Sequence, residues 1–533
     1  MTQLAGKSII GFRRGASDGD AVHALNPATG EELEPAYHSA RPEEVDEAAQ
    51  LASKAFETYA HVSGKHKAIF LRKIAENISS LGDELVTRAT QETALPPARI
   101  KTETARTCNQ LRMFAALVDE GSWVDARIDR CDSNRTPLPK PDVRSMLKPL
   151  GPVVVFCASN FPLAFSVAGG DTASALAAGN PVIVKAHHAH PGTGELVGLA
   201  VSDAARECDL PEGVFSLLFG PGREVGRQLI THPLIKAGGF TGSRSGGQVL
   251  MKLASSRDEP IPFYAEMSSV NPIFILPSAL SEKSEAITKG LHASVTLGAG
   301  QFCTNPGLVF IPHDGSEKLI DRLSDLIATT TPFTMLTPGI CSAYQEGVEK
   351  LRQNPHVELV AEQEVNEMGN CLAGAALFQT DAISFREDQS LRAEVFGPST
   401  LMIKYSSREQ LIECARSLEG QLTATIHADE EELQNSHDLI AILQTKAGRL
   451  LFNGFPTGVE VGHAMVHGGP FPATSDGRST SVGTRAALRF TRPVCYQDWP
   501  EEALPEELKN ANPLRIWRMA DGLMTNASWP DKR

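Results

Sequence analysis

The sequence predicts an α/β protein in which parallel strands alternate with helices. Three observations predict this class: short apolar runs recur, helical patterns separate them, and the 533 residues are enough for two or three domains. Nearly continuous apolar strands are typical of parallel sheets with helices on both faces. A nucleotide-binding architecture is therefore the leading hypothesis.

The alternation is clearest between residues 151 and 240. The strands are expected at 152–157, 181–185, 214–218 and 235–240. The helices are expected at 168–178, 193–208 and 224–231. The second half repeats this rhythm, with strands expected at 271–276, 307–311 and 400–404 and a helix ending near Leu297. It therefore predicts a second α/β domain.

The remaining segments are less regular. Small and apolar residues at helical spacing predict surface helices from Pro42 to Ala60 and from Lys65 to Thr93. The stretch from Trp123 to Leu147 is charged and rich in turns, and the last thirty residues are expected to pack as a short tail. The chain contains no internal repeat.

Composition excludes several classes of protein. A formal charge of −14 argues against a nucleic-acid partner, because phosphate binding needs clustered Lys and Arg. Nine scattered cysteines without zinc-like spacing are expected to be reduced thiols. The N-terminus does not resemble a signal peptide, and no apolar window is long enough to span a membrane. We therefore expect a cytoplasmic protein.

Cys303 is the candidate nucleophile. A lone free cysteine is usually an apolar filler of the core. Here, however, Gly298-Ala299-Gly300 precedes it and Asn305-Pro306-Gly307 follows, a loop composition that lets a ligand approach the backbone.

One reaction that a nucleophilic thiol could serve is the oxidation of an aldehyde to which the thiol first adds. That reaction also needs an oxyanion donor, a hydride acceptor and a base that activates water. Asn160 follows a predicted strand, where open α/β sheets bind ligands, although it could simply end that strand in a turn. Glu266 has apolar and small neighbours, and burial would raise its pKa toward that of a base; the alternative is a surface carboxylate. The turn containing Thr241, Gly242 and Ser243 opens a helix, where backbone amides could hold a pyrophosphate.

Together these segments resemble the aldehyde dehydrogenase superfamily over nearly the whole chain. The motifs that carry the resemblance, in order, are Asn26–Gly30, Asn160, Lys185, Phe240–Ser243, Glu266, Cys303 and Glu394–Pro398. The resemblance implies a Rossmann-like cofactor domain, an α/β catalytic domain and a small bridging β-sheet. The implied boundaries are 1–123 with 148–266 for the cofactor domain, 267–483 for the catalytic domain, 124–147 with 484–500 for the oligomerisation segment, and 501–533 for the tail.

The resemblance also implies a role for each motif. Cys303 is then the nucleophile, Asn160 and the Cys303 backbone N–H form the oxyanion hole, and Glu266 is the base for deacylation. The residues implied to contact the cofactor are Lys185, His188, Thr241, Gly242, Ser243, Glu394 and Phe396. A homodimer or homotetramer is expected, because the bridging strands would otherwise leave open sheet edges.

Two departures from the common family pattern stand out. Met267-Ser268-Ser269-Val270 follows Glu266 where many members have Leu-Gly-Gly-Lys, so the loop of the base is expected to differ. His188 stands where NAD-preferring members often carry a glutamate, so NADP is expected to be preferred over NAD, because a 2′-phosphate meets no like charge. A metal site made by His187, His188 and His190 is not expected, since no acidic or thiolate partner accompanies them.

Segments 453–461 and 467–476 are similar to those of the α-ketoglutarate semialdehyde (2,5-dioxovalerate) dehydrogenases within the superfamily. The small-molecule substrate implied is 2,5-dioxovalerate, oxidised to 2-oxoglutarate. Candidate substrate contacts, from their places beside the motifs, are Phe161, Phe165, Phe302 and Phe455. An arginine for the substrate carboxylate is expected, but the sequence does not single one out.

Three other readings stay open. A related bacterial group oxidises long-chain fatty aldehydes. A coenzyme-A-acylating enzyme would pass the thioester to another thiol, whereas Glu266 favours hydrolysis. A non-enzymatic binding protein would not need every catalytic position that this chain contains.

Overall fold

The protein is described here by a computed structural model, over residues 3–365 and 371–528. In these ranges the strands form two seven-stranded sheets, one five-stranded sheet and two pairs. Each of the three larger sheets forms the centre of one part of the described chain.

The first seven-stranded sheet runs in the order β11-β10-β7-β8-β9-β1-β2. Strands β7 to β11 pair in parallel, and β1 and β2 extend one edge in antiparallel fashion. The bounds are β1 (Ile9–Ile10), β2 (Arg13–Arg14), β7 (Val153–Phe156), β8 (Val182–Lys185), β9 (Phe215–Leu218), β10 (Ala237–Thr241) and β11 (Phe263–Glu266). The four strands expected between residues 151 and 240 are confirmed, and they are parallel because helices connect them.

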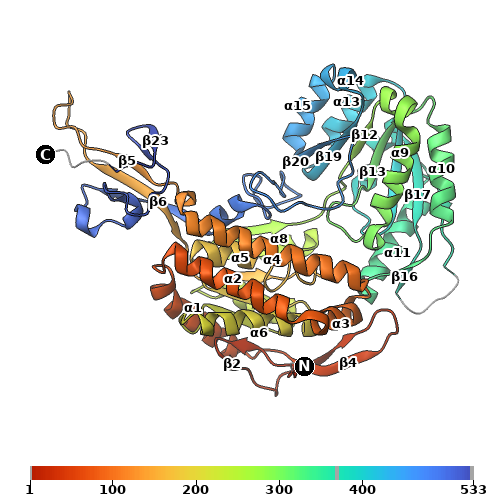
Figure 1. Ribbon diagram of the computed structural model, residues 1–533. Helices are drawn as coiled ribbons and strands as arrows, with labels where there is room; N and C mark the ends of the chain where they lie inside the picture. The colour runs from red at the N-terminus through yellow and green to blue at the C-terminus, as the bar shows by residue number, and fades with distance from the viewer. Residues whose placement is uncertain (1–2, 366–370, 529–533) are drawn as a thin grey trace.

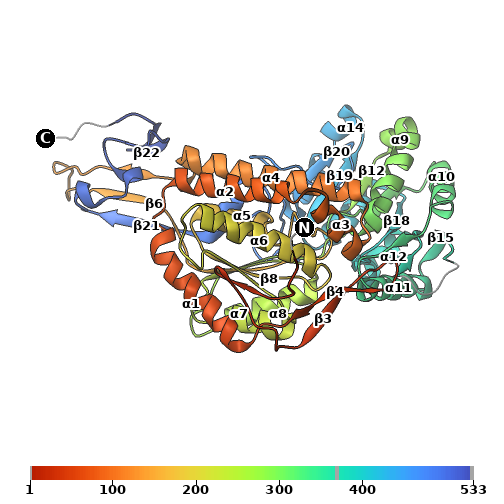
Figure 2. The ribbon, with the colours of Figure 1, turned by 60° about the horizontal axis from the view of Figure 1, so that its bottom comes forward.

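Helices cover both faces of this sheet, as Figure 2 shows around β8. One face packs against α1 (Pro42–Tyr59), α7 (Arg227–Thr231) and α8 (Arg244–Ser255). The other packs against α2 (Gly64–Ser80), α3 (Gly82–Thr93), α4 (Pro97–Glu120), α5 (Gly170–Ala178) and α6 (Pro191–Glu207). The segment from Lys65 to Thr93 is thus two helices, because the chain turns at Gly82, where φ is +52°. The long helix α4 was not among the predicted elements.

The second seven-stranded sheet runs in the order β15-β17-β18-β13-β12-β19-β20, and only β15 is antiparallel. Its strands are β12 (Ile273–Ile275), β13 (Leu308–Pro312), β15 (Glu358–Glu362), β17 (Ala376–Asp381), β18 (Ser399–Tyr405), β19 (Gln421–His427) and β20 (Ala447–Phe452). One face packs on α9 (Pro277–Thr296) and α10 (Glu317–Ala328). The other packs on α11 (Pro338–Gln353), α12 (Ala382–Glu387), α13 (Arg408–Ser417) and α15 (His437–Lys446), and the short α14 (Glu430–Gln434) precedes α15. The second α/β unit expected from sequence is therefore present.

The five-stranded sheet forms an arm that projects from the body at the left of Figure 1. Its order is β21 (Thr491–Gln497), β6 (Val143–Pro149), β5 (Arg127–Asp129), β22 (Arg518–Ala520) and β23 (Leu523–Thr525). The C-terminal region, expected as a tail, supplies the last two of these strands. The remaining pairs are β3 (Ala21–Leu25) with β4 (Glu32–His38), and β14 (Phe333–Thr334) with β16 (Leu372–Ala373).

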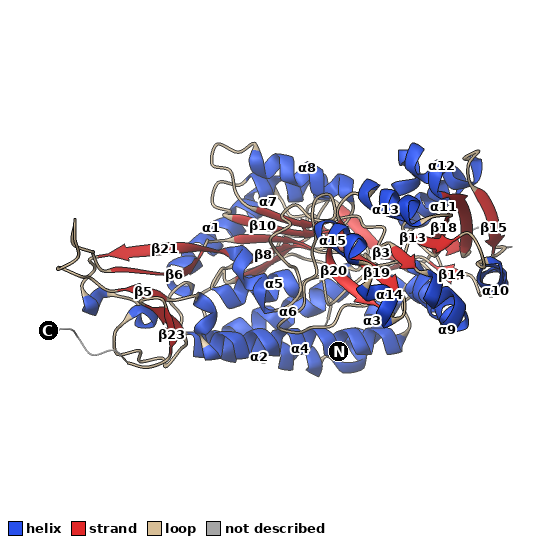
Figure 3. Ribbon diagram, turned by 90° about the horizontal axis from the view of Figure 1, so that it is seen from above, coloured by secondary structure: helices blue, strands red, loops and turns tan. Residues whose placement is uncertain are grey.

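Residues 453–490 lead from the second sheet back to the first. The Met267 amide donates to the Ala473 carbonyl (2.8 Å) and the Ser475 amide to the Ala265 carbonyl (2.9 Å), so this segment pairs with β11. Seen from above in Figure 3, the two seven-stranded sheets form separate groups of strands. The returning segment therefore bridges the sheets. Over residues 3–365 and 371–528, no helix has both the length and the apolarity for a membrane crossing.

Candidate active site

Cys303 follows a tight turn that ends α9. Gly298, Ala299 and Gly300 have φ of 57°, 60° and 64°, three left-handed residues in succession. A Cβ on Gly300 would lie 2.3 Å from the backbone of Gly397, so only glycine allows this close approach. The turn therefore packs the Cys303 loop directly against the segment that begins at Glu394.

Two asparagine amides fix the backbone on either side of Cys303. The Asn160 Nδ2 donates to the Gln301 carbonyl at 2.9 Å. The Asn271 Nδ2 donates to the carbonyl of Cys303 at 2.8 Å and to that of Asn305 at 2.9 Å. Asn160, which follows β7, thus lies beside the chain that leads into Cys303.

Glu266 and Cys303 meet at His467. The His467 Nε2 lies 3.4 Å from the Cys303 Sγ and 2.9 Å from the Glu266 Oε1. The Ser481 hydroxyl donates to the other oxygen of Glu266 at 2.7 Å. Glu266 and His467 are 3% and 1% exposed, so these contacts form in a dry environment where each is stronger than in water.

The returning segment positions His467. Its backbone N–H donates to the Thr480 hydroxyl at 2.9 Å, and its carbonyl accepts from the Ser481 N–H at 2.8 Å. The Nδ1 of His467 is buried without a hydrogen-bond partner. The imidazole is therefore held by its backbone and by Glu266, and its Nε2 edge faces both functional side chains.

The surroundings shift the pKa of Cys303 upward and the pKa of Glu266 downward. Burial, with the nearby Glu266 charge, raises the pKa of the Cys303 thiol well above its ordinary value. Burial alone would raise the pKa of Glu266, but attraction to His467 and hydrogen bonds from His467, Ser481 and Cys303 outweigh it, and the pKa is lowered. The sequence-based expectation that the Glu266 pKa is raised is therefore wrong. At neutral pH Cys303 is a thiol that needs a proton acceptor, and Glu266 is a carboxylate.

Sequence reasoning did not assign any chemistry to His467. The segment that begins at His467-Gly468-Gly469 served only to show similarity to one group of dehydrogenases within the superfamily. A buried histidine in a glycine-rich segment was the available signal, but its neighbours in space come from segments more than 160 residues earlier in the chain.

Comparisons with known proteins show the family of this chain. The sequence matches the aldehyde dehydrogenase family over residues 13–479. The chain belongs to the aldehyde dehydrogenase family. It is similar to "Alpha-ketoglutaric semialdehyde dehydrogenase 2" of Azospirillum brasilense, with 49% identity over 98% of this chain and 99% of the relative. It is also similar to "Alpha-ketoglutaric semialdehyde dehydrogenase" of Acinetobacter baylyi, with 45% identity over 98% and 100%.

Solved structures support the aldehyde dehydrogenase fold. The aldehyde dehydrogenase KauB from Pseudomonas aeruginosa superposes with a TM-score of 0.80 at 19% identity, covering 93% of this chain and 97% of that one. The NAD⁺ complex of an aldehyde dehydrogenase from Bacillus cereus gives 0.79 at 20% identity, covering 92% and 96%. As a member of this family, the protein is an NAD(P)-dependent oxidoreductase that acts on aldehydes.

Ser268 and Ser269 stand where glycines are usual in the family. They connect the loop after Glu266 to strand β19. The buried Ser269 hydroxyl donates to Gln421 Oε1 at 3.0 Å and accepts from the Leu422 amide at 3.0 Å. The Ser268 hydroxyl and the Ser269 amide donate to Glu394 and counteract a pKa that burial raises to about 7. The substitutions therefore connect the Glu266 loop to the second sheet.

The donor set expected to hold the cofactor lies at the carboxyl ends of β8 and β10. Lys185 ends β8, is 7% exposed and forms no ion pair with a described residue; burial lowers its pKa to about 8. Ser243 caps α8 by accepting from the Gly246 amide at 3.2 Å, next to Thr241 and Gly242. A buried amine without an acid partner and a helix N-terminus suit the hydroxyls and phosphates of a dinucleotide.

His188 and Phe396 are the remaining residues that the resemblance implies contact the cofactor. His188 is exposed three residues beyond Lys185, and its ring stacks on His187 with centroids 4.4 Å apart. The His190 ring also stacks on His187, at 5.4 Å, so the three imidazoles lie side by side. Phe396 is half-buried, next to the Gly397 that contacts the Cys303 loop.

Three of the four candidate substrate aromatics form one cluster. Phe161 lies 5.1 Å from Phe165 and 5.3 Å from Phe302 between ring centroids. Phe165 in turn lies 5.9 Å from the His467 ring. Phe455 lies apart from this cluster and packs on His427 at 5.1 Å. The cluster therefore forms an apolar wall beside the nucleophile.

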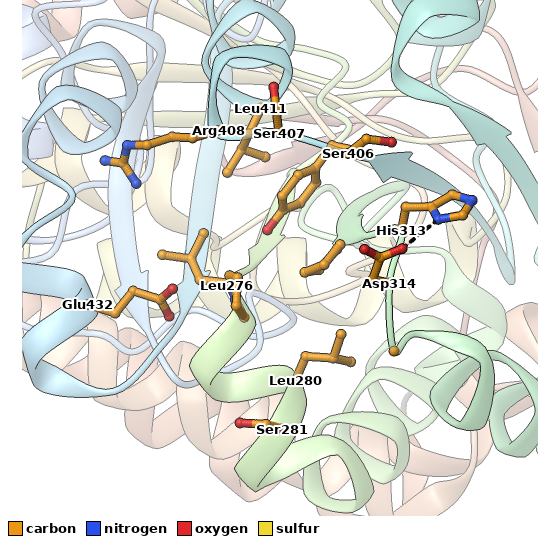
Figure 4. A pocket seen from close by; sticks show the side chains of 14 residues that line it. Leu276, Leu280, Ser281, His313, Asp314, Ser406, Ser407, Arg408, Leu411 and Glu432 are labelled. Carbon is orange, nitrogen blue, oxygen red and sulfur yellow. Dashed lines mark hydrogen bonds and ion pairs between the residues drawn. The ribbon is translucent and has the colours of Figure 1, made fainter.

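Metal-compatible side chains come together only at the catalytic group within the described ranges. The ligand atoms of Glu266, Cys303 and His467 lie within 4.8 Å of one another. A separate cavity of about 560 Å³ lies at the far end of β13, as Figure 4 shows around Leu276, Arg408 and Glu432. Glu266, Cys303 and His467 do not line that cavity.

Proposed function

We propose that this aldehyde dehydrogenase oxidises α-ketoglutaric semialdehyde (2,5-dioxovalerate) to 2-oxoglutarate. The chemistry rests on one observation, the contact of His467 with both Cys303 and Glu266. The substrate is supported by the names of two relatives, which are 49% and 45% identical over almost the whole chain.

In the first step the Cys303 thiol transfers its proton to the carboxylate of Glu266, with which it forms a hydrogen bond, and Glu266 releases this proton to solvent before deacylation. The Sγ then adds to the aldehyde carbon and forms a thiohemiacetal. The Asn160 Nδ2 and the Cys303 backbone N–H would donate to the oxyanion that develops. Because the site is buried, these donors stabilise the charge more strongly than water would.

A bound nicotinamide would supply the hydride acceptor for this adduct, and Cys303 would then carry a thioester. Glu266, ionised at neutral pH, then takes a proton from the water that attacks the thioester. Ser481 and His467 hold the carboxylate in position. The products are the free acid and the regenerated thiol.

Cofactor binding is assigned to the same surface. Lys185 and Ser243 with the adjacent Thr241 and Gly242 would hold the adenosine and pyrophosphate portion, while Glu394 and Phe396 would contact the nicotinamide ribose.

NADP is the preferred form because His188 places no carboxylate where a 2′-phosphate would lie. His188→Glu should therefore lower the NADP to NAD ratio of kcat/KM by at least tenfold; an unchanged ratio would contradict this preference.

The three sheets are assigned separate tasks. The segments 1–123 and 148–266 would bind the cofactor, 267–483 would carry catalysis, and the arm would mediate oligomerisation. Within the described residues, β21 of the arm and β20 of the second sheet are edge strands with one unpaired side each, and a homodimer or homotetramer would cover them. Sedimentation of the purified protein tests this: a monomer at micromolar concentration would contradict it.

Substrate choice is tested by one panel of rates. We expect the highest kcat/KM for 2,5-dioxovalerate, a lower value for glutarate semialdehyde and the lowest for a long-chain aldehyde, each measured with NADP and NAD. A preference for the long-chain aldehyde would assign the protein to the fatty-aldehyde group instead. Formation of acyl-CoA rather than free acid, with coenzyme A present, would assign it to the acylating enzymes.

A further inference from the structure

Arg106 lies in the middle of α4, behind the aromatic wall of the active site. Its guanidinium carbon is 5.3 Å from the centroid of the Phe165 ring, and that ring is 5.9 Å from the His467 ring. On the opposite side its Nη2 donates to the Val459 carbonyl at 3.2 Å. One aromatic ring therefore separates Arg106 from the catalytic histidine.

The charge of Arg106 has no acidic partner in contact. No carboxylate of the described residues lies within 4 Å of it, and its Nη1 is buried without a hydrogen-bond partner. Glu103, Glu460 and the Cys303 sulfur influence its pKa only from a longer distance, and burial lowers that pKa. A buried cation with a free donor is costly unless an anion binds to it.

The neighbouring Arg99 provides a contrast. It stacks on Phe161 at 4.7 Å and on Phe302 at 4.9 Å, but it also forms an ion pair with Glu103 at 3.3 Å. Arg99 is thus neutralised inside the protein, whereas Arg106 is not. Of the two arginines beside the aromatic wall, Arg106 is the one that can accept a carboxylate from a ligand.

We propose that Arg106 binds the carboxylate of the substrate and so selects short aldehydes that end in a carboxylate. This inference rests on the proposed function and names its specificity residue. A five-carbon oxo acid spans about 5 Å from aldehyde carbon to carboxylate carbon. In the proposed pose it presents its aldehyde to Cys303, places its methylenes on Phe165 and Phe161, and gives both carboxylate oxygens to the guanidinium.

The proposal is tested with two aldehydes of equal length, glutarate semialdehyde and pentanal. In the wild-type enzyme the oxo acid should have the higher kcat/KM. Arg106→Met should lower kcat/KM for the oxo acid by about a hundredfold, mainly through KM, and leave pentanal within threefold. Arg106→Lys should lie between. Arg112→Met, on the exposed side of α4, is the control and should match the wild type.

The outcomes separate this inference from the function it rests on. A wild-type enzyme that does not prefer the oxo acid would overturn both. A preference that survives in Arg106→Met would overturn the role of Arg106 alone. Because that variant could fail to fold, the wild type is also tested with pentanoate and pentanamide as competitive inhibitors. Pentanoate should bind at least tenfold more tightly, and equal binding would overturn the proposal.

Discussion

Replacing His467 tests how the active-site residues share the proton transfer from Cys303. His467→Gln keeps a side-chain donor near Glu266 but removes the attraction to His467 that keeps Glu266 ionised, and an ionised Glu266 is what takes the Cys303 proton. Burial and the charge of Glu266 raise the pKa of Cys303 well above its ordinary value, so few molecules carry a thiolate at neutral pH. We therefore expect the variant to react slowly with every aldehyde.

The size of the loss follows from the role. Burial then raises the pKa of Glu266 with less to oppose it, and each unit of increase costs about tenfold in the ionised base at pH values below that pKa, or roughly 1.4 kcal/mol. The pH dependence supplies a second signature. In the variant, kcat/KM should rise about tenfold per pH unit up to the raised pKa of Glu266, across a range in which the wild-type carboxylate is already ionised. The wild type should be much flatter there.

The assay is single-turnover formation of reduced cofactor, followed from pH 6 to 9. Alkylation of Cys303 by iodoacetamide over the same range reports thiolate formation without cofactor. His463→Gln, an exposed histidine of the same segment, is the matched control and should behave as the wild type. A His467→Gln variant with kcat/KM within threefold of the wild type and an unchanged pH profile would refute the reasoning.

Three other variants have distinct expected outcomes. Glu266→Gln should form one equivalent of reduced cofactor per site, more slowly than the wild type, and then stall, because deacylation loses its base; stopped-flow absorbance measures this, and continued turnover would contradict it. Asn160→Ala should lower kcat about a hundredfold to a thousandfold while cofactor affinity, measured by fluorescence titration, is unchanged; a normal kcat would remove it from the oxyanion hole. Ser481→Ala removes a donor that lowers the pKa of Glu266, so the acidic limb of the kcat profile should move to higher pH by about one unit; a shift to lower pH would contradict the assigned contact.

The sequence predicted most of the central β-strands because their apolar runs are continuous and bounded by turn residues. It did not predict α4, because that helix carries polar residues along most of its length and its buried residues are spread among them. It also treated residues 501–533 as a tail. The strands β22 and β23 are three residues each and pair with β5, so only the fold brings them into a sheet.

The candidate site was predictable where chemistry depends on local context. The loop around Cys303 and the position of Asn160 after a strand made both residues candidates from their neighbours, and the family resemblance implied their roles. His467 and Arg106 were not predictable in this way, because each acquires its meaning from residues that are distant in the chain. Likewise, the lowered pKa of Glu266 depends on His467 and Ser481, which lie about 200 residues away and outweigh the burial that sequence reasoning considered.

The central claim is that Cys303 carries the acyl group during turnover. Peptide-mapping mass spectrometry of the Glu266→Gln enzyme, quenched in acid after mixing with glutarate semialdehyde and cofactor, tests it directly. The acyl mass should appear on the peptide that contains Cys303 and disappear when Cys303→Ser is added to the variant. An acyl group on another residue, or a Cys303→Ser enzyme that still turns over, would contradict the account.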